Sequence, residues 1–256
     1  MAHVFSGVGP VAIAHRGGSL EVPENTAEAA AHAAALGVVM ETDARLSADG
    51  EVVLFHDEDL ARTTGVAGPV EHLPWSAVAE LSVHGGGAPA RLVDVLAAHP
   101  DLRLNIDAKT DAVVDPLVAV LGDAGAADRV CLAAFSGQRL SRIRSALPAF
   151  TSLSPAEVGA LVAGSVLPLV GRVLTALVPG PDDGAVALQV PERYRGVPVV
   201  TRRALAAAHR LGLQVHVWTV DERADMERLL DMGVDGIITD RPSLLLEVLD
   251  RRGPWH

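Results

Sequence analysis

The amino-acid sequence predicts an α/β fold, a TIM (β/α)8 barrel with a small insertion after the second strand. Short apolar runs alternate with longer alanine- and leucine-rich stretches of helical periodicity, which is typical of parallel β/α units. The chain has 256 residues, and a barrel of this kind typically has about 250. We therefore expect a single domain over residues 1–256, although a doubly wound open sheet also shows this alternation.

Eight segments have the length and composition of buried strands. The first, Val11–Ala14, precedes a helical pattern over Thr26–Leu36. The other predicted strands are Val38–Asp43, Leu102–Asp107, Val130–Ala134, Phe150–Leu153, Ala185–Gln189, Gln214–Trp218 and Gly236–Ile238. The helices expected between or after them are Ala112–Leu121, Gly137–Ala146, Arg203–Leu211, Glu222–Met232 and Ser243–Arg251.

The second β/α unit departs from the repeat. Asp49-Gly50, placed between two apolar runs, predicts a tight turn and an added strand over Val52–His56. The stretch 57–90 then combines polar loop residues, a short helix expected at Ser76–Leu81 and three consecutive glycines. We interpret it as a small insertion between the second strand and its helix, where the loops of a barrel carry function.

Charge and composition exclude several classes of function. The 32 acidic and 21 basic residues give a net charge of −11, which argues against unaided binding to nucleic acids or anionic membranes. The single cysteine, Cys131, allows no disulfide framework and no cysteine-based zinc site. Pro168 and Arg172 interrupt the apolar stretch Val158–Val178, so we expect one or two amphipathic helices there and no stable membrane insertion. Without a secretory signal at the start, the expected location is cytoplasmic, and the oligomeric state stays open.

Carboxylates gather at the ends of two predicted strands. Glu41 and Asp43 come at the end of an apolar run and are separated from each other by one residue. On a strand, both side chains therefore project from the same face, about 7 Å apart. Asp107 and Lys109 repeat the arrangement on the third predicted strand. Three carboxylates there suit a hard cation such as Mg²⁺ or Ca²⁺, because these ions prefer oxygen ligands. Solvated carboxylates at strand ends are the alternative.

Two histidines and an arginine are expected at the same end of the barrel. His15 and Arg16 follow the first strand and precede two glycines, which let the backbone approach a ligand closely. Arginine presents a fork of donors to a phosphate, and Lys109 adds a point charge. His56 ends the added strand. Imidazoles exchange protons near neutral pH, so two of them beside acids and Arg16 suit general acid/base catalysis.

Two residues near the end of the chain allow two interpretations each. Trp218 ends the alternating run of the seventh predicted strand and either lines the mouth of the pocket or fills the barrel core. Asp240 follows the eighth strand and precedes Pro242, a residue suited to the first turn of a helix. We expect Asp240 to cap that helix rather than to bind a ligand.

These residues belong to an ordered set of motifs that runs through nearly the whole chain. The set comprises His15-Arg16-Gly17, Pro23-Glu24-Asn25-Thr26, Glu41-Thr42-Asp43, Asp49-Gly50, His56-Asp57, Leu60, Arg62-Thr63-Thr64, Asn105-Ile106-Asp107-Ala108-Lys109, Val217-Trp218-Thr219-Val220 and Gly233 to Pro242. A single piece such as His-Arg-Gly is a weak signal. The whole ordered set resembles the glycerophosphodiester phosphodiesterase family.

The resemblance implies a TIM barrel with an insertion after the second strand, in agreement with the placement of residues 57–90. It also implies a role for each site residue. His15 and His56 would be the acid/base pair, Arg16 and Lys109 would contact the phosphate, and Glu24 would support Arg16. Glu41, Asp43 and Asp107 would bind a divalent cation. The third ligand in this family is often glutamate, so the shorter Asp107 leaves the choice between Mg²⁺ and Ca²⁺ open.

The implied reaction cleaves a glycerophosphodiester into an alcohol and sn-glycerol 3-phosphate. An alternative is lysophospholipase D activity, for which the apolar stretch Val158–Val178 would have to supply an acyl groove. A second alternative is a non-catalytic protein that binds a phosphate-containing ligand, since a fold alone does not establish activity. A nucleic-acid phosphodiesterase is less favoured, because the chain has no basic stripe and only 3% aromatic residues.

Overall fold

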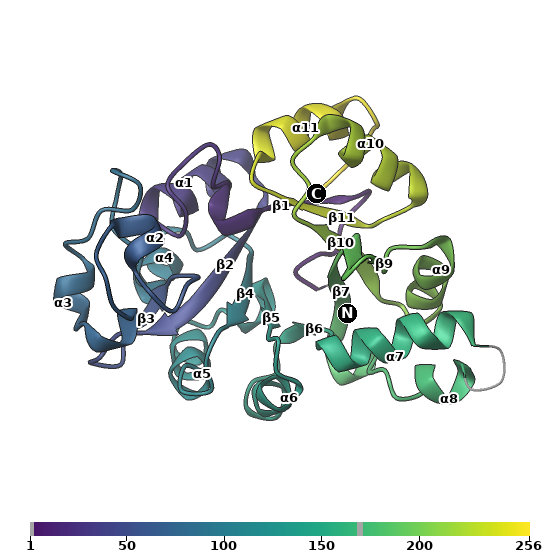
Figure 1. The fold of residues 1–256 in the computed structure, drawn as a ribbon, viewed down its shortest axis with the longest axis horizontal. Helices are drawn as coiled ribbons and strands as arrows, with labels where there is room; N and C mark the ends of the chain where they lie inside the picture. Colours follow the sequence, from purple (N-terminus) through teal and green to yellow (C-terminus); the bar gives the residue numbers. More distant parts are fainter. Residues whose placement is uncertain (1–2, 168–170) are drawn as a thin grey trace.

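The structure is a computed structural model that describes residues 3–167 and 171–256, and it confirms the predicted barrel. Eight parallel strands form a closed cylinder, because β1 pairs with β2 on one side and with β11 on the other (Figure 1). The strands are β1 (Val11–Ala14), β2 (Val39–Leu46), β4 (Leu104–Ala108), β5 (Val130–Ala133), β6 (Phe150–Ser152), β7 (Ala185–Pro191), β10 (Gln214–Trp218) and β11 (Gly236–Thr239). The open-sheet alternative is thereby excluded.

Helices cover the outside of this cylinder. They are α1 (Ala27–Leu36), α4 (Leu92–Ala98), α5 (Val114–Asp123), α6 (Gly137–Ala146), α7 (Pro155–Val166), α8 (Gly171–Thr175), α9 (Arg202–Arg210), α10 (Arg223–Met232) and α11 (Pro242–Asp250). The stretch Val158–Val178 contributes to α7 and α8 as expected, and Pro168 lies outside the described residues. Within the part of the chain that the structure describes, every helix is too short or too polar to cross a bilayer.

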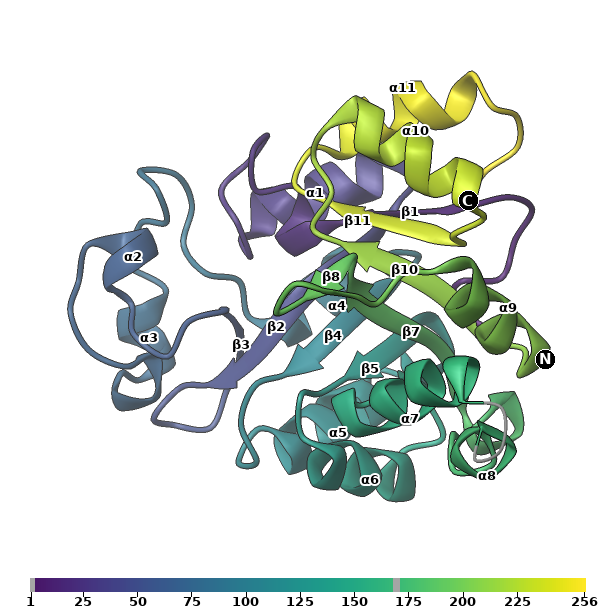
Figure 2. The same cartoon turned by 45° about the vertical axis from the view of Figure 1, so that its right-hand side comes forward.

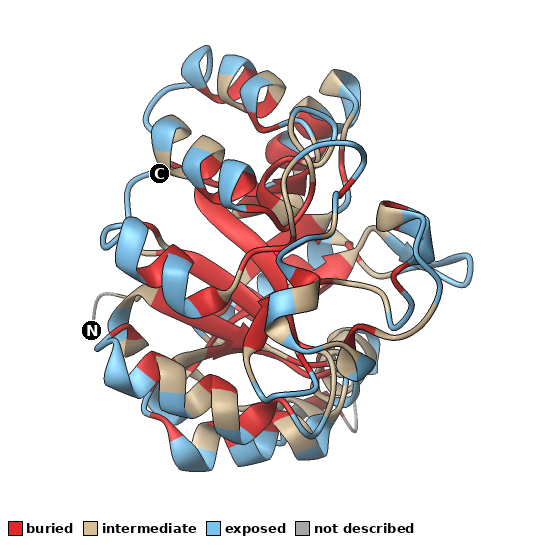
Figure 3. Cartoon of the chain, turned by 90° about the vertical axis from the view of Figure 1, so that its left-hand side faces the viewer, coloured by how far each residue is buried: buried red, intermediate tan, exposed pale blue. Residues whose placement is uncertain are grey.

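Alternation along the strands separates two apolar cores. On β2, Met40 and Ala44 pack into the large cluster between strands and helices, whereas Val39 belongs to a smaller cluster that includes Ile13 and Val186. Figure 3 shows the strands almost entirely buried and the helices exposed on their outer faces. Since successive side chains of a strand point to opposite faces, Glu41 and Asp43 share the face of Val39 and point into the barrel.

The predicted insertion lies at the end of the barrel toward which the strands point (Figure 2). It begins after β3 (Val52–Leu54), which pairs antiparallel with the extended end of β2, and contains α2 (Ala61–Thr64) and α3 (Trp75–Val78). A small apolar cluster holds it together: Val53, Phe55, Leu60, Val70 and Val78. The added strand stops two residues before the predicted end at His56, whose carbonyl oxygen accepts a hydrogen bond from Arg45 Nε at 3.1 Å.

The helices α2 and α4 were not predicted, and neither was an exposed hairpin. A two-stranded hairpin of β8 (Arg193–Tyr194) and β9 (Val197–Pro198) follows β7 directly, at the same end of the barrel as the insertion. Its strands have only two residues each, all of them exposed, so they lack the alternation on which strand prediction depends.

Candidate active site

The predicted site residues come together at the carboxyl end of the barrel strands. His15 and Arg16 form a short 3-10 turn directly after β1. In the pairing of β2 with β4, Asp43 lies opposite Asp107. His56 follows β3 and reaches the site from the insertion side. Active sites of barrels of this class are built at this end, from loops that follow the strands.

The turn after β1 depends on an unusual backbone conformation. Arg16 has φ 52° and Gly17 has φ 88°, both in the left-handed region. A Cβ atom on Gly17 would lie 2.5 Å from the Cβ of Ala29, so only glycine fits at this position. The turn directs the Arg16 backbone N–H to Glu41 Oε2 at 3.0 Å and its guanidinium to Glu24 Oε1 at 2.9 Å.

Asp240 holds His15, and the predicted helix cap is wrong. The Asp240 carboxylate lies 2.6 Å from His15 Nδ1, whereas α11 begins at Pro242 after Arg241, which makes no capping side-chain bond. Burial opposes a charged His15, but the hydrogen bond to Asp240 and the charge of Glu41 outweigh it and raise the pKa of His15. An ionised carboxylate only accepts hydrogen bonds, so Nδ1 carries the proton and Nε2 faces the site.

Asp57 holds His56 in the same way. The Asp57 Oδ1 atom lies 2.6 Å from His56 Nδ1, and Asp57 Oδ2 accepts a hydrogen bond from Arg62. Although partial burial opposes ionisation, the hydrogen bonds from Arg62 and His56 lower the pKa of Asp57 to about 2. Burial, together with the positive charge of Lys109, lowers the pKa of His56 despite the nearby carboxylates. Both imidazoles therefore have an acidic partner on Nδ1.

The three carboxylates share a buried cluster with Lys109. Lys109 Nζ lies 2.7 Å from both Asp43 Oδ1 and Asp107 Oδ2. Asn25 Nδ2 donates a hydrogen bond to the second Asp43 oxygen at 3.1 Å. Burial, together with the negative charge of Asp43, raises the pKa of Glu41 to about 7. The cluster therefore contains three acidic side chains, and the single positive charge of Lys109 cannot balance all of them.

This cluster has the chemistry that a hard divalent cation requires. Asp107 Oδ1 is buried without a hydrogen-bond partner, and all three acidic side chains offer oxygen ligands. Among the described residues, no three or more His, Cys, Asp or Glu side chains are arranged to hold a metal ion. The Lys109 ammonium group bridges Asp43 and Asp107 through one oxygen of each carboxylate.

Two aromatic side chains border the site. Trp218 is partly buried against the inner barrel cluster, and its ring contacts Phe135 edge to face with centroids 6.3 Å apart. Phe135, which follows β5, is 66% exposed, and Lys109 Nζ lies 5.9 Å from its ring centroid. Trp218 thus contacts both the core and the mouth of the site.

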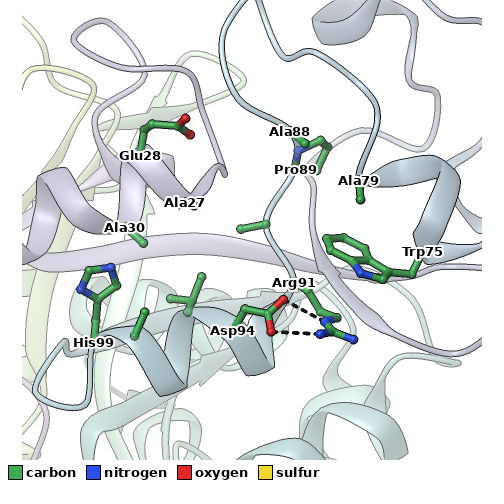
Figure 4. Close-up of a pocket in the computed structure, with 13 residues that line it drawn as sticks. Ala27, Glu28, Ala30, Trp75, Ala79, Ala88, Pro89, Arg91, Asp94 and His99 are labelled. Carbon is green, nitrogen blue, oxygen red and sulfur yellow. Dashed lines mark hydrogen bonds and ion pairs between the residues drawn. The ribbon is translucent and has the colours of Figure 1, made fainter.

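A separate hollow of about 330 Å³ lies between α1, α4 and the insertion (Figure 4). It is lined mainly by alanines and Trp75. Of its charged side chains, Arg91 and Asp94 bond to each other at 2.9 Å through two nitrogen–oxygen contacts, and Glu28 also lines the hollow. The hollow contains neither of the two histidines nor the carboxylate cluster, so it is distinct from the candidate active site.

Sequence reasoning missed or misassigned several residues of the site. Asp240 and Asn25 lie within the sequence motifs that carry the family resemblance, so the motifs include these residues but do not predict their contacts. The same is true of Arg62, whose partners come from two other parts of the chain. Phe135 gave no signal, because a single aromatic residue after an apolar strand is common.

Known proteins are similar to this chain over nearly its whole length. The model of the glycerophosphoryl diester phosphodiesterase family matches residues 15–244. A relative from Mycobacterium tuberculosis, described as a probable glycerophosphodiester phosphodiesterase 2, is 41% identical over 96% of this chain and 93% of its own.

Two solved structures have the same fold. A glycerophosphodiester phosphodiesterase from Agrobacterium tumefaciens is 26% identical over 95% of this chain and 100% of its own, with a TM-score of 0.72. An Oleispira antarctica phosphodiesterase, solved with the product sn-glycerol-3-phosphate, covers 94% of this chain and 97% of its own at 20% identity and a TM-score of 0.76. The chain is therefore a member of the glycerophosphoryl diester phosphodiesterase family.

Proposed function

We propose that this chain hydrolyses glycerophosphodiesters to an alcohol and sn-glycerol 3-phosphate. The observation that carries the proposal is the pair of imidazoles, His15 and His56, each held by an acidic residue at 2.6 Å beside Arg16 and the carboxylate cluster. The names of the relatives and the product bound to the Oleispira antarctica enzyme support the same reaction.

The two histidines move the protons of this reaction. Asp240 and Asp57 keep the proton on Nδ1 of each neutral ring, so Nε2 is free to accept a proton or, when protonated, to donate one. One histidine takes the proton from the attacking hydroxyl. The other gives a proton to the oxygen of the departing alcohol, so that the P–O bond breaks without releasing an alkoxide.

The remaining residues bind and orient the phosphate. Arg16 offers its guanidinium to the phosphoryl oxygens while Glu24 fixes its direction, and Lys109 adds a second positive charge. Trp218 borders the substrate at the mouth. Glu41, Asp43 and Asp107 would hold a divalent cation, Mg²⁺ or Ca²⁺. When bound, such an ion would supply Lewis-acid stabilisation of the negative charge on the phosphate.

The nucleophile is either water or the glycerol 2-hydroxyl of the substrate. Attack by the 2-hydroxyl gives a cyclic phosphate, which a water molecule then opens. Phosphorus NMR during turnover distinguishes the two routes, since only the second produces a cyclic intermediate.

Two histidine variants test the proposal. We expect His15→Ala and His56→Ala each to lower kcat on glycerophosphocholine by roughly 10²–10⁴-fold, the usual contribution of general acid/base groups. A diester with a nitrophenol leaving group needs little protonation, so the variant lacking the acid will recover most of its rate on it. Near-normal turnover by either variant on glycerophosphocholine would exclude the role proposed for that histidine.

The alternative functions predict different substrates. Leu161 of α7 is fully buried and Val158 packs against the outer core, so these two side chains are used in packing. Val166, Leu167, Val173 and Leu177 are exposed, but they lie at and beyond the end of α7, and α8 is far from the insertion (Figure 2). We therefore expect activity on glycerophosphocholine to exceed that on lysophosphatidylcholine. The opposite preference would establish a lysophospholipase D. A protein that only binds a phosphate-containing ligand would release no alcohol from either substrate.

A further inference from the structure

We propose that Arg62 is a positioning residue that aligns His56 and Arg16 together, so that the docked insertion is part of the working site. The inference deepens the proposed function and rests on it. Arg62 belongs to α2 in the insertion, whereas Arg16 follows β1. Its guanidinium connects the acidic partners of both residues.

The first half of the connection runs through Glu24. Arg62 Nη1 lies 2.9 Å from Glu24 Oε2, and Arg62 Nη2 lies 2.7 Å from Glu24 Oε1. The same Oε1 atom accepts a hydrogen bond from Arg16 Nη1 at 2.9 Å. Glu24 is 6% exposed, and a buried carboxylate needs its charged partners to stay ionised in place. Arg62 therefore fixes the carboxylate that directs Arg16.

The second half runs through Asp57. Arg62 Nε bonds to Asp57 Oδ2, which leaves Asp57 Oδ1 directed at His56 Nδ1. The orientation and tautomer of His56 thus depend on a carboxylate whose other oxygen is held by Arg62. The resulting chain of contacts runs from Arg16 through Glu24, Arg62 and Asp57 to His56.

Only arginine has the geometry for this connection. Its planar guanidinium presents five N–H donors in a fixed fork, and here three nitrogens bind two different carboxylates. Lysine keeps the positive charge but has one nitrogen, which cannot hold both oxygens of Glu24 and reach Asp57 in the same geometry. The substitution Arg62→Lys therefore separates positioning from charge.

Kinetics of Arg62 variants give the first test. With glycerophosphocholine, we expect Arg62→Lys and Arg62→Ala each to lower kcat/KM by roughly 10²-fold, because misplacing a reacting group by about 1 Å has an effect of this size. Methylguanidinium added to Arg62→Ala will restore part of the rate, and methylammonium will not. A value for Arg62→Lys within twofold of the wild-type enzyme would overturn the inference.

Arg91→Lys is the matched control. Arg91 likewise forms a forked contact with a carboxylate, Asp94, and stacks 5.3 Å from the centroid of Trp75, but it lies outside the site. We expect its kcat/KM to match the wild type. Thermal unfolding of every variant identifies any loss that comes from unfolding alone.

NMR of ¹⁵N-labelled histidines tests the inference without turnover. The wild-type His56, assigned by comparison with His56→Asn, will carry its proton on Nδ1 with a downfield hydrogen-bonded resonance. In Arg62→Lys this resonance will broaden or shift toward the exposed-imidazole position, while Arg91→Lys leaves it unchanged. An unchanged His56 resonance in Arg62→Lys contradicts the inference even if the chain hydrolyses no glycerophosphodiester, whereas failure of the proposed function appears as an inactive wild-type enzyme.

Discussion

Each histidine of the site depends on an acidic partner. The partner of His15 comes from a distant part of the chain, and the partner of His56 is the next residue. His15 and Asp240 are 225 positions apart, and they meet because closure of the barrel places the end of β11 beside the end of β1. An aspartate before proline at a helix start satisfies the rules for a helix cap equally well. Local sequence chemistry could therefore not distinguish the two roles, and only the closed barrel does.

Substituting Asp240 tests its role in holding the tautomer of His15. Asparagine has a similar shape but offers both a donor and an acceptor, so it does not enforce a proton on Nδ1. We expect Asp240→Asn to lower kcat on glycerophosphocholine by at least roughly 10²-fold. Asp235→Asn is the control, since Asp235 forms a similar 2.8 Å contact with His209 away from the site. Equal activity of the two variants would refute the role of Asp240.

The sequence motifs placed most residues of the site correctly in the fold. They could not predict the contacts that long side chains make. Glu41 and Asp43 share a strand face, which period-two alternation alone predicts. The bridge of Lys109 between Asp43 and Asp107 depends on the register of β2 with β4, where these two aspartates lie opposite each other. Register is a property of the assembled sheet, so no single segment contains it.

At the scale of elements, the turn after β1 and the insertion build the site on a rigid frame. The predicted strands and helices agree with the observed ones to within a few residues, because buried strands and amphipathic helices have strong periodicity. β2 extends three residues beyond its predicted end at Asp43, since it gains β3 as an antiparallel partner. The exposed β8–β9 hairpin has no buried face, so hydrophobic patterning could not reveal it.

Substitution of Gly17 tests how far the turn after β1 determines the site. Alanine there must adopt φ 88°, and its Cβ would lie 2.5 Å from the Cβ of Ala29. We expect Gly17→Ala to lower the free energy of unfolding by about 2–3 kcal/mol and to reduce activity. Gly65→Ala has a similar φ of 73° but nothing within 4 Å of the added Cβ, so it should cost only about 1 kcal/mol. Chemical denaturation of both variants measures the difference, and equal losses would show that the contact with Ala29 is unimportant.

At the scale of the whole molecule, the closed barrel buries a polar group on β10, the strand that also carries Trp218. His216 of β10 is fully buried, with Nε2 2.9 Å from Gln214 Oε1 and its ring 4.5 Å from that of Phe5. Burial, assisted by the positive charges of His3 and His256, lowers the pKa of His216 to about 3. Alternation showed that Gln214, His216 and Trp218 share one face, but only the cylinder decides which face is enclosed.

The stability of the chain should therefore depend on pH through His216. The unfolded chain takes up a proton here near pH 6.5, and the folded chain does not until about pH 3. The stability that the neutral, buried His216 contributes is thus fully present above pH 6.5 and is lost as the pH falls below this value. Between pH 6.5 and 5, the free energy of unfolding of the wild type should fall by about 1.6 kcal/mol more than that of His216→Gln, since the full slope of about 1.4 kcal/mol per pH unit is reached only below pH 6.5.

Urea denaturation of the two proteins in EDTA measures this difference. Other titratable groups, such as Glu41, are present in both proteins, so their effect cancels in the comparison. The same pH dependence in His216→Gln and the wild type would show that folding does not lower the pKa of His216.

The most direct single measurement is the release of sn-glycerol 3-phosphate from glycerophosphocholine by the purified chain. The protein is treated with EDTA, and Mg²⁺, Ca²⁺ or Mn²⁺ is then restored in turn. We expect no release with EDTA and full release with at least one of these ions, because the buried carboxylate cluster has the oxygen ligands that they prefer. Undiminished release with EDTA would contradict the role given to Glu41, Asp43 and Asp107, and no release with any ion would contradict the proposed reaction.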